Sequence, residues 1–261
     1  MKLKSAFSYQ FKNGLRLLGW TGVWAVAAII VVPFLTKVLL GRLNTLSPGD
    51  FLPNGFLGFV LMVFLIFYSA PTYRGFQFMI QNGVGRKTYF YARFFTIFTL
   101  VFLGDLVSSL YNFLEGKISY NYPTLNLHLH IVNFYNHYFS NGFFNIVVPW
   151  LIVFLLFVCV AATCMFFGSI LSLFERRFQI ALIIGVPIVL IFAFIVVRGQ
   201  ADLQLTWIGR VLLWIIGGHS NFYHISVGHL NPYAPLFSGI VYSAILFFGT
   251  YLFNLKLKTP R

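Results

Sequence analysis

The sequence predicts an all-α integral membrane protein: six transmembrane helices in a single transmembrane domain over residues 1–261. Three observations lead to this fold class. The chain is 59% hydrophobic, only 9% of its residues are charged, and the apolar residues come in long runs. A soluble globular domain carries about 25% charged residues, so this deficit argues against a soluble fold. The runs are about as long as the hydrocarbon core of a bilayer is thick, which makes lipid their expected solvent.

Before the first span, residues 1–16 are expected to form an amphipathic helix that lies at the membrane interface, in the inner headgroup layer. At helical spacing, Phe7 and Phe11 define an apolar face, whereas Lys12 and Arg16 lie along another face. An alternative is that this segment is the inner end of a longer first helix.

Six apolar runs are the expected spans. Each is long enough, or nearly so, to cross about 30 Å of hydrocarbon as a helix. They lack the in–out alternation of barrel strands, so helices are expected. The second run is the shortest and is expected to include residues from Phe51 onward. The six runs are residues 17–40, 55–70, 89–111, 144–173, 179–197 and 234–255.

Between spans five and six, the apolar segment 203–218 is too short for a further span and has Arg210 at its midpoint. A central Arg costs a span at least about 2.5 kcal/mol. We therefore expect this segment to be a half-inserted helix on the outer face.

The distribution of Lys and Arg sets the expected orientation, because cytoplasmic connections carry an excess of these residues. With both termini in the cytoplasm, most of the 18 Lys and Arg residues lie inside. Those left outside are Lys37, Arg42, Lys117, Arg198 and Arg210. The net charge of +13 is thus scattered beside the membrane rather than gathered on one soluble face, so no nucleic-acid partner is expected.

No catalytic motif is found in the sequence. It has no nucleophile elbow, P-loop, Gly-rich dinucleotide turn or paired intramembrane carboxylates. We expect no enzymatic activity and no cofactor on this chain. The histidines all fall in outer connections with no acidic or cysteine partner nearby, so no metal site is predicted. They are His128, His130, His137, His219, His224 and His229.

Ionisable residues inside spans usually mark ion paths, and the predicted spans contain few of them. Asp105 is placed within about two turns of the outer loop, and Arg93 near the inner end of its span, where its side chain reaches the interface. Neither position suits a relay, and this weakens the hypothesis of an ion-coupled carrier.

The connection at residues 70–91, APTYRGFQFMIQNGVGRKTYFY, is the most informative segment. Pro71 ends the second span, residues 73–80 have the spacing of an amphipathic helix, and Asn82-Gly83 signals a turn. The sequence therefore predicts a short helix across the inner membrane face.

The stretch QNGVGRKT at residues 81–88 resembles the first cytoplasmic loop of type-2 ABC transporter permeases. The Asn231-Pro232 pair in HLNPYAPL is also similar to that family, as is the layout of the whole chain. By motif the resemblance covers only residues 81–88 and 231–235. The connection at residues 174–178 is shorter than is usual in the family.

This resemblance implies a membrane-spanning permease subunit of an ATP-driven exporter in a prokaryotic cell membrane. It implies a separate ABC ATPase subunit that holds the ATP, and a second permease copy or a related permease in the bilayer. Phe76, Phe78 and Met79 are expected to enter a groove of the ATPase, and Arg86 and Lys87 to hold the loop at the membrane surface. The expected ATPase-coupling loop comprises Tyr73, Arg74, Phe76, Phe78, Met79, Gln81, Asn82, Gly83, Arg86 and Lys87.

Two other functions remain open from the sequence. One is an ion-coupled carrier that works without an ATPase. The other is a membrane immunity or regulatory protein that acts by binding another membrane component. The cargo is not indicated, because lipid-facing packing explains the 33 phenylalanines as well as an amphipathic cargo does.

Overall fold

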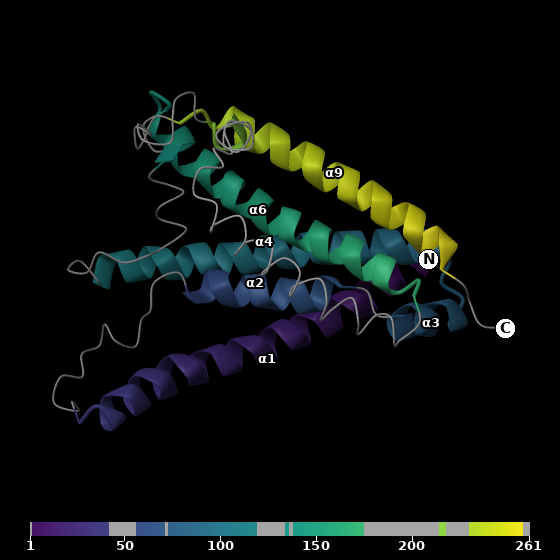
Figure 1. Cartoon of the computed structure of the whole chain (residues 1–261), viewed down its shortest axis with the longest axis horizontal. Coiled ribbons are helices and arrows are strands. Elements are labelled where there is room, and N and C mark those ends of the chain that lie inside the picture. Colours follow the sequence, from purple (N-terminus) through teal and green to yellow (C-terminus); the bar gives the residue numbers. More distant parts are fainter. Residues whose placement is uncertain are drawn as a thin grey trace, which may run out of the picture.

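A computed structural model describes residues 2–41, 56–70, 73–118, 134–135, 138–174, 214–217 and 230–257. All regular secondary structure in this part of the chain is helical (Figure 1). The helices are α1 (Lys2–Leu39), α2 (Phe56–Ser69), α3 (Tyr73–Gln81), α4 (Arg86–Ile118), α6 (Gly142–Leu171) and α9 (Tyr233–Lys256).

Four helices, α1, α4, α6 and α9, are long and apolar enough to cross a membrane. α2 is a shorter apolar helix of 14 residues. The expectation of an all-helical fold is confirmed for the described residues, and the four long apolar helices are consistent with a multi-pass membrane protein. The expected fifth span at residues 179–197 lies outside the described residues, so the count of six spans stays a prediction.

Two helices are longer than expected. α1 is one continuous helix of 38 residues, about 57 Å long, without a break between residues 16 and 17. The expectation of a separate segment over residues 1–16 is corrected on this point, and the alternative of a longer first helix is what is observed. Whether its first turns lie in the headgroup layer stays a prediction. α4 continues past Tyr111 to Ile118, which leaves Asp105 more than about three turns from its end.

The bundle is organised around α4, which contacts α1, α2, α6 and α9. The start of α1, the short helix α3 and the end of α9 gather at one end of the bundle (Figure 1). Toward its C-terminal end α1 diverges from the other helices, and Trp24 there is 71% exposed. This half of α1 therefore has little contact with the rest of the described chain.

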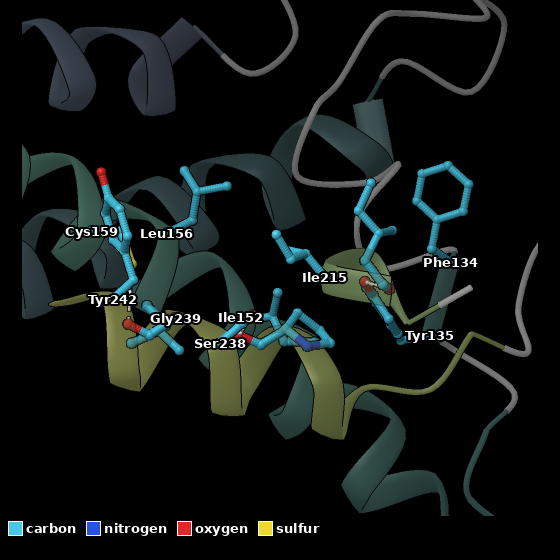
Figure 2. A pocket seen from close by; sticks show the side chains of 12 residues that line it. Phe134, Tyr135, Ile152, Leu156, Cys159, Ile215, Ser238, Gly239 and Tyr242 are labelled. Atoms are coloured by element: carbon cyan, nitrogen blue, oxygen red, sulfur yellow. Dashed lines mark hydrogen bonds between the residues drawn. The ribbon is translucent and has the colours of Figure 1, made fainter. Parts of the chain in front are cut away.

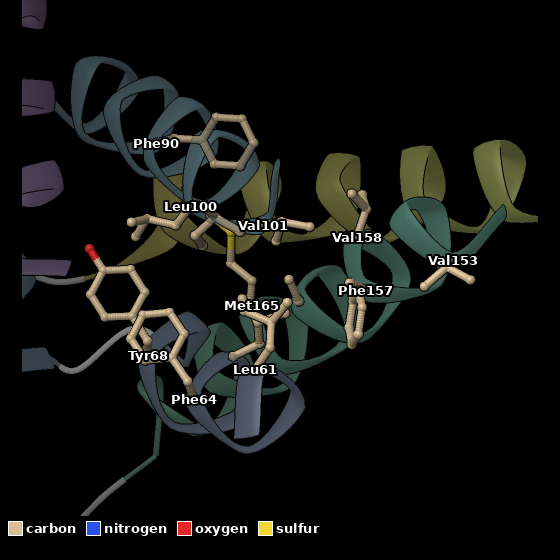
Figure 3. Close-up of a cluster of buried hydrophobic side chains, with 13 residues drawn as sticks. Leu61, Phe64, Tyr68, Phe90, Leu100, Val101, Val153, Phe157, Val158 and Met165 are labelled. Atoms are coloured by element: carbon tan, nitrogen blue, oxygen red, sulfur yellow. The ribbon is translucent and has the colours of Figure 1, made fainter. Parts of the chain in front are cut away.

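The main core lies between α2, α4 and α6 (Figure 3). It combines aromatic side chains of α2 with branched aliphatic side chains of α4 and α6. Phe11 and Leu18 of α1 pack against its edge. Its buried members are Leu61, Phe64, Leu65, Tyr68, Phe90, Ile97, Leu100, Val101, Val153, Phe157, Val158, Ala161 and Met165.

The close approach of α1 to α2 and α4 at Gly14 gives a testable prediction. A Cβ at Gly14 would lie 2.5 Å from Leu100 Cδ1 and 2.7 Å from the Tyr68 hydroxyl oxygen. Both neighbours are buried, and the Tyr68 hydroxyl donates to the Gln10 carbonyl over 2.9 Å, so neither moves freely. Gly14→Ala should therefore lower the free energy of unfolding by about 1–3 kcal/mol.

Gly19→Ala is the matched control, because a Cβ at Gly19 meets nothing within 4 Å. It should leave stability unchanged or raise it slightly through helix propensity. Thermal unfolding of both variants in the same detergent measures the difference. Equal melting temperatures would contradict the packing of α1 against α4.

Candidate functional site

α3 and the turn that follows it form as the sequence predicts. The helix ends at Gln81, and Gly83 takes the left-handed conformation with φ of 75°. The Gly83 N–H donates to the Ile80 carbonyl over 2.9 Å, and the Val84 N–H donates to the Met79 carbonyl over 3.0 Å. These two bonds are the Schellman pattern, which satisfies helix C-terminal carbonyls and favours glycine at the turn.

The apolar face of α3 is buried against the chain itself. Phe76 is only 1% exposed, and its ring packs edge-to-face on Tyr89 of α4 at 5.3 Å between centroids. Phe76 and Met79 share a cluster with Ala6 of α1 and Leu257, which follows α9. The expectation that Phe76 and Met79 enter a partner's groove is therefore corrected, because their side chains already fill the space between α1, α4 and the end of α9.

The opposite side of α3 faces outward. Phe78 is 47% exposed and stacks on Tyr9 of α1 with a centroid separation of 5.6 Å. Asn82 is exposed, and its amide donates to the Phe78 carbonyl over 2.7 Å. Tyr73 and Arg74 begin the helix, and their side chains lie outside the described residues. We call the exposed side chains of this region the α3 surface: Phe78, Gln81, Asn82 and Lys87.

The basic residues at the start of α4 differ in role. Arg86 donates from Nη1 to the Leu255 carbonyl over 2.6 Å, at the C-terminal end of α9, where a cation is favourable. Lys87 is exposed. Arg93 does not extend to the interface as expected: it donates to the Tyr68 carbonyl, and its guanidinium carbon lies 4.8 Å from the centre of the Tyr68 ring.

A buried polar stripe on α4 is the feature that the sequence analysis missed. Asp105, Ser108 and Asn112 are 0%, 1% and 7% exposed, and their spacing places them on one helix face. Within the described chain, neither carboxylate oxygen of Asp105 has a hydrogen-bond partner. The Ser108 hydroxyl and both polar atoms of the Asn112 amide lack one as well. The i, i+3, i+7 spacing was the available signal.

A cavity of about 510 Å³ lies between α6 and α9, next to the short helical turns at residues 134–135 and 214–216 (Figure 2). Its walls are almost wholly apolar. The lining residues are Phe134, Tyr135, Ile152, Leu155, Leu156, Cys159, Ile215, Ile216, Pro235, Ser238, Gly239 and Tyr242.

The polar groups of this cavity are bonded within the chain. The Tyr135 hydroxyl donates to the Ile216 carbonyl over 2.7 Å, and burial raises the pKa of Tyr135 to about 12, so the donor keeps its proton at neutral pH. The Cys159 thiol donates to the Gly239 carbonyl over 3.4 Å. The Ser238 hydroxyl donates to the Pro235 carbonyl, and the Tyr242 hydroxyl forms a hydrogen bond with the Thr163 hydroxyl. The cavity therefore offers a ligand chiefly nonpolar contacts.

The Asn-Pro pair before α9 has a local structural role. The Asn231 side-chain oxygen accepts from the Tyr233 N–H over 3.0 Å, and the Asn231 N–H donates to the Gly217 carbonyl over 3.1 Å. The Leu230 N–H donates to the Phe134 carbonyl over 3.2 Å. Asn231 thus bonds the first N–H of α9, and Asn231 and Leu230 together join three separate stretches of chain beside the cavity.

Comparison of the chain with protein-family models, with curated proteins and with solved structures finds no match in any of the three. Among the described residues, no group of three or more His, Cys, Asp or Glu side chains is placed to hold a metal ion. The six histidines and most of segment 203–218 lie outside those residues.

The hydrogen bond from Arg86 to α9 gives a second prediction. Arg86→Met leaves the Leu255 carbonyl without its charged donor and should lower the free energy of unfolding by about 1–3 kcal/mol. Lys87→Met removes the neighbouring, exposed charge and should change it by less than about 0.5 kcal/mol. Thermal unfolding of the purified variants compares the two. If both lower the melting temperature equally, the bond to α9 contributes nothing specific.

Proposed function

We propose that this chain is the membrane-spanning permease subunit of an ATP-driven exporter of the type-2 ABC class. It works with a separate ABC ATPase, which holds the ATP, and with a second permease copy or a related permease. It lies in the cytoplasmic membrane with both termini inside. The resemblance of residues 81–88 and the layout of the helices are the sequence support for this proposal.

The attachment of α3 is the observation that carries the proposal. Through Phe76 and Met79 the helix packs on the first turns of α1, the start of α4 and the residue that follows α9. The bond from Arg86 to the Leu255 carbonyl adds a direct link between α4 and α9. A force applied to the outward side of α3 would thus act on three long helices at once, which is what coupling to a soluble motor requires.

The α3 surface has the composition of a docking site. Phe78 is a large aromatic side chain that is 47% exposed, and Gln81, Asn82 and Lys87, which follow it in the sequence, are exposed polar side chains. Protein interfaces commonly combine an aromatic anchor with a polar rim. Exposed basic side chains of α1, including Lys12 and Arg16, lie on the helix that packs beside it. We expect the ATPase to present an apolar groove with an acidic rim.

The diverging half of α1 is the surface on which we place the second permease. Trp20, Val23 and Trp24 are exposed there, and this half of α1 separates from the bundle in Figure 1. Large exposed apolar surfaces in a membrane protein contact either lipid or another helix. A symmetric pairing through α1 would bury them without disturbing α3.

An ion-coupled carrier is the second candidate function, and the buried Asp105 favours it. Unpaired ionisable groups inside membrane bundles commonly mark ion paths. Transport that stops on ATP depletion and withstands an ionophore supports the ABC permease. The reverse result supports the carrier.

The third prediction tests the α3 surface. The tagged chain, purified in mild detergent, should retain a soluble P-loop ATPase at equal stoichiometry. Phe78→Asp places a charge on the exposed anchor and should weaken that association by about 30-fold or more, while the permease stays folded. Mass spectrometry of the purified complex identifies and quantifies the partner.

Asn141→Asp is the matched control. It adds one negative charge at the exposed start of α6 and keeps the side-chain oxygen that accepts from the Phe143 N–H. It should not affect ATPase association. Phe76→Asp, by contrast, should unfold the buried cluster. A folded Phe78→Asp variant that keeps the ATPase in full excludes this surface as the docking site.

A further inference from the structure

We propose that Asp105 and Ser108 of α4 form a binding site for a small monovalent cation inside the junction of α2, α4 and α6. Asn112 continues the same polar stripe toward the end of α4. All three side chains are at least nine-tenths buried, and each has polar atoms without a partner in the described chain. Buried polar groups in folded proteins are nearly always paired, so a set of unpaired ones on one helix face points to a missing ligand.

A charge at this position needs a counter-charge that the described helices packed around it do not supply. α2 and α6 contain no Asp, Glu, Lys, Arg or His. Their titratable side chains are Tyr68, Cys159 and Cys164. On α4 itself, Arg93 lies about 18 Å away along the helix and is already bonded to the Tyr68 carbonyl.

The described basic side chains of α1 and α9, the other long helices that contact α4, form no hydrogen bond with the Asp105 carboxylate either. The described basic side chains of α1 and α9 are exposed, or half-buried in the case of Lys37. They are Lys4, Lys12, Arg16, Lys37 and Lys256. An ionised carboxylate without a partner in an apolar interior is strongly disfavoured. A cation that binds to it would therefore stabilise the packing of α2, α4 and α6 around it.

The geometry of the junction favours a small ion. Ser108 lies one turn beyond Asp105 on the same face, which places a hydroxyl oxygen beside the carboxylate. Opposite this face α2 has a glycine: a Cβ at Gly58 would lie 3.4 Å from the Ser108 hydroxyl and 3.8 Å from the Phe157 ring of α6. Asn112 lies about 10 Å from Asp105 along α4, too far to share one ion, but on a line from the end of the helix to the carboxylate.

The single carboxylate sets the charge of the occupant. Ca²⁺ sites use six to eight oxygen ligands, commonly with several carboxylates, and Mg²⁺ keeps a shell of waters that this packed junction would have to admit. A monovalent cation balances one carboxylate without leaving net charge in the bundle. Two cations share this chemistry: a proton, held on a carboxylate oxygen, and Na⁺, held between the carboxylate and the Ser108 hydroxyl.

Thermal unfolding of the purified full chain tests the site without any transport assay. In one arm Na⁺ replaces choline over about a hundredfold concentration range at constant ionic strength and pH. Bound Na⁺ should raise the wild-type melting temperature by about 3 °C or more and leave Asp105→Asn unchanged. In the other arm pH varies from about 5 to about 8 without Na⁺. A proton occupant should change the difference in melting temperature between wild type and Asp105→Asn by about 3 °C or more.

Ser108→Ala and Thr99→Ala form the matched pair for the Na⁺ arm, because the Thr99 hydroxyl donates to the Phe95 carbonyl over 2.8 Å and lies on another face of α4, about 9 Å from Asp105 along the helix. Ser108→Ala should reduce the Na⁺ response, and Thr99→Ala should keep it. A response in either arm that depends on Asp105 supports the site and identifies the cation. A wild type that responds in neither arm, or a response that Asp105→Asn retains in full, overturns it.

This measurement is independent of the proposed ABC function. A wild type without a Na⁺ or pH response would overturn the cation site but not the ATPase association, and absence of an ATPase would overturn the ABC function but not the cation site. The two proposals therefore fail separately.

Discussion

The packing of α4 against every long helix around it is the constraint on which the rest of the structure depends. Lipid tails are as apolar as leucine, so helices in a bilayer associate through close fit rather than through the hydrophobic effect. α4 achieves this fit differently on its two sides. Toward α2 it presents Gly104, where a Cβ would overlap Leu61. Toward α6 and α9 it presents aromatic rings, with Phe94 packed edge-to-face on Phe247 at 4.8 Å.

The polar residues of α4 fall into two groups with opposite consequences. Near its start Arg86 and Arg93 donate hydrogen bonds to carbonyls of α9 and α2 and so join α4 to those helices, although the buried Nε of Arg93 has no partner in the described chain. Farther along, Asp105 and Ser108 are buried beside α2 and α6, and their side-chain oxygens have no hydrogen-bond partner in the described chain. A satisfied polar group stabilises one arrangement, whereas an unsatisfied one makes that arrangement depend on a ligand. Near its start α4 is thus held to its neighbours by hydrogen bonds within the chain, whereas around Asp105 its packing depends on a ligand.

The sequence predicted the end of α3, which has a local signal in the Asn82-Gly83 turn. It predicted α6 from its apolar run alone, and the N-cap at Asn141 was not recognised. It did not predict that α1 is continuous, because the change of polarity near residue 16 looked like a boundary, whereas the helix runs through Gly14 and Gly19 without a break. It predicted the amphipathic character of α3 but not what covers its apolar face: a face buried on its own bundle and one offered to a partner have the same periodicity. Asp105 was expected within about two turns of the outer loop. Because α4 continues beyond Tyr111 to Ile118, Asp105 lies more than about three turns from the end of its helix. ATPase coupling, permease pairing and orientation stay predictions.

The proposed docking surface on α3 and the proposed cation site at Asp105 both depend on the packing of α4, so the two sites should be thermodynamically coupled. The α3 surface and the Asp105 site lie at different levels of the bundle, but both act on the packing of α4 against its neighbours. If the cation prefers one packing of α2, α4 and α6, then any load on α3 that changes the population of that packing changes the affinity for the cation. Reciprocity requires the converse: occupancy at Asp105 changes the work needed to move α3. The coupling would be large if the Asp105 carboxylate were neutralised by a cation in one packing of the bundle and hydrated in another. The free-energy difference between a buried and a hydrated carboxylate is among the largest available to a single side chain.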